Sequence, residues 1–146
     1  MPVSLIRMET LALQKFVDAC RIGYFATSDE NSQPHVVPVC FLVQGENAYI
    51  TIDDKPKRGG KPLKRISNIL HNPRVALVVD HYEEEWSKLG WVMFKGHAEI
   101  LNIGSEHDCA QELLQIRYPQ MQLMDLQKHP VIAMRIDKVS SWGAVK

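Results

Sequence analysis

Residues 69–81 read ILHNPRVALVVDH, and the hydrophobic pattern changes within this short stretch. Ile69 and Leu70 end a series of apolar residues that begins at residue 63 and recurs at spacings of three and four, which is typical of a helix. Asn72-Pro73 ends that helix, because the residue before a proline disfavours the helical conformation. Arg74–His81 is then rich in valine and predicts a strand. At this junction the chain is therefore predicted to pass directly from a helix into a strand.

Three strands with intervening turns are predicted upstream of this junction. They cover residues 21–28 (RIGYFATS), 33–43 (QPHVVPVCFLV) and 48–53 (AYITID). The polar tetrapeptides DENS and QGEN separate them and favour turns, so we expect the three strands to form an antiparallel meander. An amphipathic helix over residues 4–20 is predicted to precede them.

Two further strands and a helix are predicted downstream. The strands cover residues 91–101 (WVMFKGHAEIL) and 130–139 (PVIAMRIDKV). Ser105 and Asp108 have the spacing of a capping box, which predicts a helix from Ser105 to about Tyr118. Six strands with turn signals and a few short helices indicate an α+β, mainly β fold, in which a small barrel is wrapped by helices.

The composition is that of a single globular domain covering residues 1–146, with 45% apolar and 23% charged residues. No apolar run of about 18 residues is present, and the N-terminal MPVSLIRMETLALQKF does not have the apolar centre of a signal peptide, so we expect neither a membrane span nor export. Cys20, Cys40 and Cys109 are odd in number and far apart, which favours free thiols in a reducing cytoplasm. Seventeen basic residues balance 17 acidic residues, which argues against general nucleic-acid binding.

Positive charge is concentrated in one segment of this neutral chain. Residues 53–65 read DDKPKRGGKPLKR and hold six of the 17 lysines and arginines. Gly59-Gly60 precedes a predicted helix start, and helix N-termini bind phosphate through their free N–H groups and the helix dipole. The residues predicted to share one face of that helix are Lys61, Lys64, Arg65 and Asn68. A site for a phosphorylated or acidic ligand is the favoured interpretation, and a solvated basic loop is the alternative.

Other residues give weaker chemical signals. The six histidines form no H-x-H or H-E-x-x-H pattern, so no metal site is predicted. Cys40 lies in an apolar strand, where an inert thiol is usual, and no G-x-S-x-G nucleophile motif is present. The tryptophans Trp86, Trp91 and Trp142 are typical of a core or an interface, and each could also stack on a planar ring. The sequence shows no acid–base pair placed for hydrolysis, so any catalysis is expected to depend on a bound cofactor.

The order of these elements is similar to that of a known family. In order, they are QPHVVPV (33–39), YIT (49–51), the basic segment, ILHNPRV (69–75), ALVVD (76–80) and FKGHAEIL (94–101). This series resembles the pyridoxamine 5'-phosphate oxidase-like superfamily of split β-barrels over most of the chain. KPKR (55–58) and NPRVALVVDHYEEEW (72–86) are most similar to the branch of oxidoreductases that depend on the deazaflavin coenzyme F420. The resemblance implies a six-stranded antiparallel split β-barrel with flanking helices. It also implies a homodimer with FMN or coenzyme F420 at the subunit interface, while some members of the superfamily bind haem.

The resemblance implies contacts to the ring and to the phosphate of that cofactor. The backbone of one strand lies along the isoalloxazine ring, and its positions in this chain are Val37, Pro38 and Val39. A residue near the ring or the ribityl chain corresponds to Thr51. A basic pair that holds the phosphate corresponds to Lys64 and Arg65.

Further residues extend the implied site beyond this phosphate group. Lys57 and Arg58 lie in an additional basic turn, placed to contact either the phosphate or the acidic tail of F420. Trp91 corresponds to a residue that reaches the partner's cofactor. Trp142 corresponds loosely to a tryptophan that packs near the flavin. No residue of this set is predicted to be catalytic.

The chain departs from the oxidases that act on vitamin B6. Val37 stands where those enzymes have an arginine, and no segment with Arg and His for the substrate phosphate follows, so vitamin B6 oxidation is not expected. The predicted activity is hydride transfer between FMN or F420 and a small organic substrate. The alternatives are a non-enzymatic flavin carrier or sensor of the same fold and a nucleic-acid-binding module, and the neutral charge argues against the second.

Overall fold

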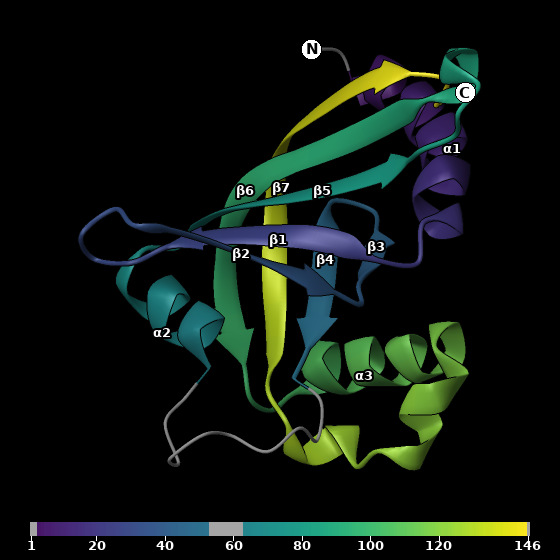
Figure 1. Ribbon diagram of the computed structural model, residues 1–146. Coiled ribbons are helices and arrows are strands. Elements are labelled where there is room, and N and C mark those ends of the chain that lie inside the picture. The colour runs from purple at the N-terminus through teal and green to yellow at the C-terminus, as the bar shows by residue number, and fades with distance from the viewer. Residues whose placement is uncertain (1–2, 53–62, 146) are drawn as a thin grey trace.

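One antiparallel sheet of seven strands forms the centre of the protein (Figure 1). The computed structural model describes residues 3–52 and 63–145, with side chains from residue 11 onward. The strands are β1 (Gly23–Ser28), β2 (Pro34–Val39), β3 (Leu42–Gln44), β4 (Asn47–Thr51), β5 (Arg74–His81), β6 (Gly90–Leu101) and β7 (Val131–Gly143). They lie side by side in the order β2-β1-β5-β6-β7-β4-β3. The predicted mainly β, antiparallel fold is therefore confirmed.

The helices lie around this sheet. The α-helices are α1 (Val3–Ala19), α2 (Lys64–His71) and α3 (Ser105–Arg117). Short 3-10 helices are η2 (Trp86–Lys88), η3 (Pro119–Leu123) and η4 (Leu126–Lys128). α2 ends at His71, and its C-cap Asn72 stands directly before Pro73, as the sequence predicts. No helix in the described ranges is long and apolar enough to cross a membrane.

The sheet has one strand more than predicted, because residues 33–43 form two strands instead of one. β2 ends at Val39 and β3 begins at Leu42. Between them, the Phe41 N–H donates to the Tyr118 hydroxyl at 3.1 Å, and the Phe41 carbonyl accepts from Arg117 Nε at 2.8 Å. These side chains occupy backbone groups that a continuous strand would use for its ladder. Both antiparallel pairings of the predicted meander form, since β2 pairs with β1 and β3 pairs with β4. The break in the middle strand places these two pairs at opposite ends of the sheet order, so they do not form one continuous meander.

The sheet curls around one main core. Buried residues from α1 and from strands across the sheet join in a single cluster, which includes Val17, Phe25, Ile50, Leu77 and Met134. The long strands β6 and β7 bend across the whole molecule (Figure 1). Their register shifts between Lys95 and Gly96, which is a β-bulge, and bulges bend and twist a strand. A Cβ atom at Gly96 would lie 1.9 Å from the Arg135 carbonyl oxygen, so only glycine fits at this bend.

A second, smaller core lies between α3 and the other face of β4 and β7. Leu114 of α3 packs there in a cluster that includes Tyr49 and Ala133. The helix begins at Ser105 as predicted, but the predicted capping box does not form. Its N-cap is Gly104, which has a φ of 113° and no side chain to bond the free N–H groups. Because α3 packs on β4 and β7, it stabilises the position of β4, the strand that ends at Thr51.

Candidate functional site

The predicted phosphate pair opens helix α2, which lies against the β1–β2 turn. Lys64 and Arg65 are the first two residues of α2. The Lys64 side chain is 55% exposed, and its Nζ lies 3.8 Å from Asp29 Oδ2. At the other end of the helix, His71 Nδ1 lies 3.4 Å from Glu30 Oε2. The charge of Lys64 is therefore shared with Asp29, although an exposed pair of this length contributes only about 0–1 kcal/mol.

Asp29 has its own role in the β1–β2 turn. Its Oδ1 accepts the backbone N–H groups of Asn31 and Gln33 at 2.8 and 2.9 Å. These two hydrogen bonds, with a smaller contribution from Lys64, lower the pKa of Asp29 below its usual value. The turn therefore fixes the position of the Asp29 carboxylate, and the longer Lys64 side chain extends toward it.

The inner side of α2 carries a buried polar pair. Asn68 is 1% exposed, and its Nδ2 donates to Thr27 Oγ1 at 2.9 Å. Asn68 was predicted to share the cationic face of α2, but the structure turns it toward β1. Its Oδ1 has no hydrogen-bond partner among the described residues. A buried amide oxygen is normally bonded, so this atom can accept a hydrogen bond from a ligand or a water molecule.

Thr51 is the last residue of β4 and is 6% exposed. Its hydroxyl is likewise buried without a hydrogen-bond partner in the described ranges. Thr51 and α2 lie on either side of residues 53–62 in the chain. The predicted positions Lys57 and Arg58 fall in that segment and lie outside the described residues.

Strand β2 places the three predicted ring-contact positions on alternating faces. Val39 is buried, Val37 is half-buried and packs on the main core, and Pro38 is exposed on the opposite face. Among the strands that the structure describes, β2 pairs with β1 alone and is an edge strand. Its second edge therefore leaves backbone N–H and C=O groups available to a ligand.

The two predicted tryptophans lie far from α2 within one chain. Trp91 and Trp142 are directly opposite each other in the β6–β7 pair, and Trp142 is 55% exposed. β5 begins at Arg74, directly after α2, and ends at His81, which pairs with Gly90 beside Trp91. The seven steps between the first and last residues of β5, at about 3.3 Å each, separate the two ends by roughly 23 Å. The structure therefore does not bring the tryptophans to the phosphate pair of the same chain.

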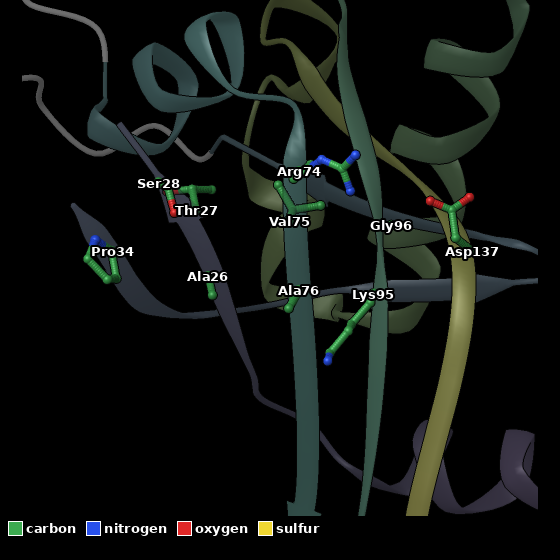
Figure 2. Close-up of a pocket in the computed structure, with 10 residues that line it drawn as sticks. All are labelled: Ala26, Thr27, Ser28, Pro34, Arg74, Val75, Ala76, Lys95, Gly96 and Asp137. Carbon is green, nitrogen blue, oxygen red and sulfur yellow. The ribbon is translucent and has the colours of Figure 1, made fainter. Parts of the chain in front are cut away.

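A cavity of about 420 Å³ lies on the sheet face that points away from the main core (Figure 2). Its lining residues are Ala26, Thr27, Ser28, Pro34, Arg74, Val75, Ala76, Lys95, Gly96 and Asp137. None of the predicted site residues that the structure describes is among them. Thr27 links this cavity to α2, because the same residue accepts the hydrogen bond from Asn68. The sequence showed these residues only as parts of separate strands and gave no signal that they converge.

The comparisons with known proteins agree with this fold. The chain is similar in structure to a conserved hypothetical protein from Mycobacterium tuberculosis, with 21% identity, a TM-score of 0.69, and coverage of 99% of this chain and 86% of that one. It is also similar to HutZ, the haem storage protein from Vibrio cholerae, with 17% identity, a TM-score of 0.69, and coverage of 90% and 91%. A haem-binding protein from Mycobacterium smegmatis gives 18% identity and a TM-score of 0.70, over 90% of this chain and 52% of that one.

Sequence comparison is informative at the level of the family. A search of curated proteins found no significant match. The family model of pyridoxamine 5'-phosphate oxidase matches residues 10–143. Since that match spans nearly the whole chain, this protein belongs to the pyridoxamine 5'-phosphate oxidase family.

Proposed function

We propose that this protein binds a phosphorylated flavin-type cofactor, FMN or F420, and acts as an oxidoreductase on a small organic substrate. The observation that carries the proposal is that groups able to bind phosphate lie directly before and directly after the basic segment in the chain. On one side is the buried Thr51 hydroxyl without a described partner, and on the other are Lys64 and Arg65 at the start of α2. A hydroxyl, two cations and a helix N-terminus are the groups that proteins use to bind phosphate.

In this proposal the protein binds and orients, and the cofactor supplies the hydride chemistry when bound. The free edge of β2 presents backbone groups to the ring near Val37–Val39. The unpartnered Oδ1 of Asn68 adds a buried acceptor on the side of α2 that faces β1. These residues provide no acid–base pair, so substrate conversion depends on how closely the substrate stacks on the ring.

FMN and F420 differ in the charge that they present to the basic segment. FMN carries one phosphate, whereas F420 adds an acidic glutamyl tail. Lys64 and Arg65 are enough for one phosphate, and Lys57 and Arg58 are further cations in the same segment. This surplus of cations favours the longer anionic ligand, and direct titration with both cofactors distinguishes them.

We further propose that the cofactor site is completed by a second copy of the chain. Trp91 and Trp142 lie roughly 23 Å along the sheet from α2, so they would reach a cofactor bound at Lys64 only from a partner subunit. Trp142 is 55% exposed, and Tyr24 and Val36 are 43% and 60% exposed. Tyr24 and Val36 are diagonal neighbours on the paired strands β1 and β2, and adjacent exposed apolar side chains are typical of a surface that another protein covers.

A non-enzymatic carrier of the same fold is the second candidate. It is favoured by the two structural neighbours described as haem-binding and haem-storage proteins. In that case the protein would hold its ligand without turnover. Bound FMN or F420 that is not reduced or oxidised by any of NAD(P)H, quinones and enones would support the carrier.

The deciding experiment is titration of the purified protein with FMN, F420 and haemin, followed by fluorescence and absorbance. We expect FMN or F420 to bind, and we expect the double variant Lys64→Ala/Arg65→Ala to bind about a hundredfold more weakly, because each charged hydrogen bond contributes about 1.5–3 kcal/mol. Lys128→Ala in η4 removes a lysine far along the chain from α2 and serves as the matched control. Binding of haemin alone, or unchanged affinity in the double variant, would contradict the proposed site.

A further inference from the structure

The cavity on the outer sheet face lies next to a row of large apolar side chains. β1, β5 and β6 are paired side by side, and the middle of β5 is marked across them by three buried residues, Phe25, Leu77 and Phe94. One position toward α2 is the cavity row, which consists of Ala26, Ala76 and Lys95 (Figure 2). One position toward the β5–β6 connection is the apolar row, which consists of Tyr24, Val78 and Met93. The same face is therefore hollow on one side of its middle and filled on the other.

Two exposed charges of opposite sign lie on this face at equal distances from its middle. Arg74 is three residues before Leu77 and Asp80 is three residues after it, so both side chains point to the outer face of β5. Within the described ranges, neither side chain forms an ion pair or a hydrogen bond with another residue. Six steps at about 3.3 Å each separate the two residues by roughly 20 Å, so they cannot pair within one chain.

This pattern of charge is self-complementary under a two-fold axis. When two copies face each other across an axis that crosses the strands at the level of Leu77, their β5 strands run antiparallel. Arg74 then lies over the partner's Asp80, and the cavity row lies over the apolar row of the other copy. An axis parallel to the strands would instead place Arg74 over the partner's Arg74. Because like charges that face each other across an interface are unfavourable, the antiparallel arrangement is preferred.

The side chains that meet in the antiparallel arrangement also fit in size. Tyr24 is 43% exposed in one chain and enters the cavity above the partner's Ala26. Met93 lies along the aliphatic stem of the partner's Lys95, and the charged end of that lysine extends past it. The remaining pair of the two rows also sets a larger apolar side chain on a smaller one. Facing sheets pack about 10 Å apart, and a large side chain opposite a small one fills that space without overlap.

The same axis brings Trp91 to the cofactor site proposed in the other copy. Trp91 is directly opposite Asp80, so it lies at the level that faces the partner's Arg74. Arg74 begins β5 directly after α2 and its two following residues, Asn72 and Pro73. Trp91 is therefore placed at the end of β5 where α2 of the other copy lies, which is what a cofactor site shared by two chains requires.

From this complementarity of shape and charge we infer that the outer sheet face binds a second copy of the chain with the two β5 strands antiparallel, and that each Arg74 pairs with the partner's Asp80. The inference rests on the proposed completion of the cofactor site by a second copy, and it adds the orientation of that copy and the residues that determine it. Tyr24 in the cavity of the other copy supplies apolar contact. The two symmetric ion pairs make the antiparallel orientation specific.

Charge reversal with rescue tests the ion pairs by sedimentation equilibrium of the purified full chain. We expect the parent to be a dimer, and we expect Arg74→Asp or Asp80→Arg to raise the Kd of the dimer at least about tenfold, because each change places like charges in both symmetric pairs. The swapped variant Arg74→Asp/Asp80→Arg restores both pairs, so its Kd should return to within about threefold of the parent. Glu112→Arg on the exposed side of α3 is the matched control, and circular dichroism shows that each variant is folded.

Crosslinking with a short bis-maleimide reads the orientation directly, in a background where the exposed Cys109 is changed to serine. Arg74→Cys/Asp80→Cys should be joined into dimers, whereas either single cysteine variant should not, because like positions lie roughly 20 Å apart along the antiparallel strands. Crosslinked single variants, an unchanged Kd after charge reversal, or a swapped variant that does not recover would overturn this inference and leave the proposed function standing. A monomeric parent would overturn it together with the proposed second copy, while titration of the Lys64 and Arg65 variants judges the phosphate site separately.

Discussion

Replacement of Glu106 by glutamine tests how α3 is held on β4 and β7. Glu106 Oε1 accepts from Arg135 Nη2 at 3.0 Å, and Glu106 Oε2 accepts from Arg135 Nη1 and from the Tyr49 hydroxyl, the latter at 2.6 Å. These hydrogen bonds, first from Arg135 and then from Tyr49, lower the pKa of Glu106 from 4.5 to about 2. That shift corresponds to roughly 3 kcal/mol. Glu106 is 39% exposed, so solvent screening reduces the expected loss to about 2 kcal/mol.

The pH dependence makes this prediction specific. A carboxylate whose pKa is lower in the folded state stabilises the fold fully above its unfolded pKa, near 4.5, and loses that stabilisation as the pH falls through about 2. Urea unfolding should therefore show the parent about 2 kcal/mol more stable than Glu106→Gln at pH 7, with the difference falling to roughly half by pH 3. Glu112→Gln on the exposed side of α3 is the control. A difference that is absent at pH 7, or that does not change with pH, would refute the reasoning.

Three further substitutions test other parts of the structure. Gly96→Ala should cost about 3 kcal/mol or more in urea unfolding, because the new Cβ would lie 1.9 Å from the Arg135 carbonyl oxygen, and a stable variant would show that the bulge is not required. Burial lowers the pKa of His107, but the His129 carbonyl and the Asp108 carboxylate, which bond its two ring nitrogens, raise it by more, so the net pKa is raised. The protonated imidazole should therefore stabilise the fold fully below pH 6.5, and this contribution to the free energy of unfolding should be lost at higher pH. We expect His107→Gln to remove this loss of stability above pH 6.5, and an unchanged pH profile would contradict the assignment. Asp29→Asn should tighten FMN or F420 binding about twofold to threefold by freeing Lys64, and unchanged affinity would place Lys64 outside the cofactor site.

The local pattern of the sequence predicts single elements well and their connections poorly. The strand predicted at Arg74–His81 has those same bounds in the structure, because its alternation of buried and exposed residues depends on nearest neighbours. The break at Phe41 was not predicted. Its causes, Arg117 and Tyr118, are 76 and 77 residues away in the chain. The turn signals correctly predicted which neighbouring segments pair, because β1 pairs with β2 and β3 pairs with β4, but they did not show that the break at Phe41 separates these two pairs in the sheet.

The same distinction between local and distant interactions applies to the sites. The cluster of charge at Lys64 and Arg65 is visible along the chain, whereas the buried contact between Asn68 and Thr27 depends on how α2 packs on β1. The outer cavity depends on register even more strongly. Ala76 is opposite Lys95 only in this alignment of β5 and β6, and a slip by one residue would put the side chain of Val75 or Leu77 beside it. Because register is set by the whole curled sheet, sequence alone can identify a cation but cannot show whether a floor of small residues lies beneath it.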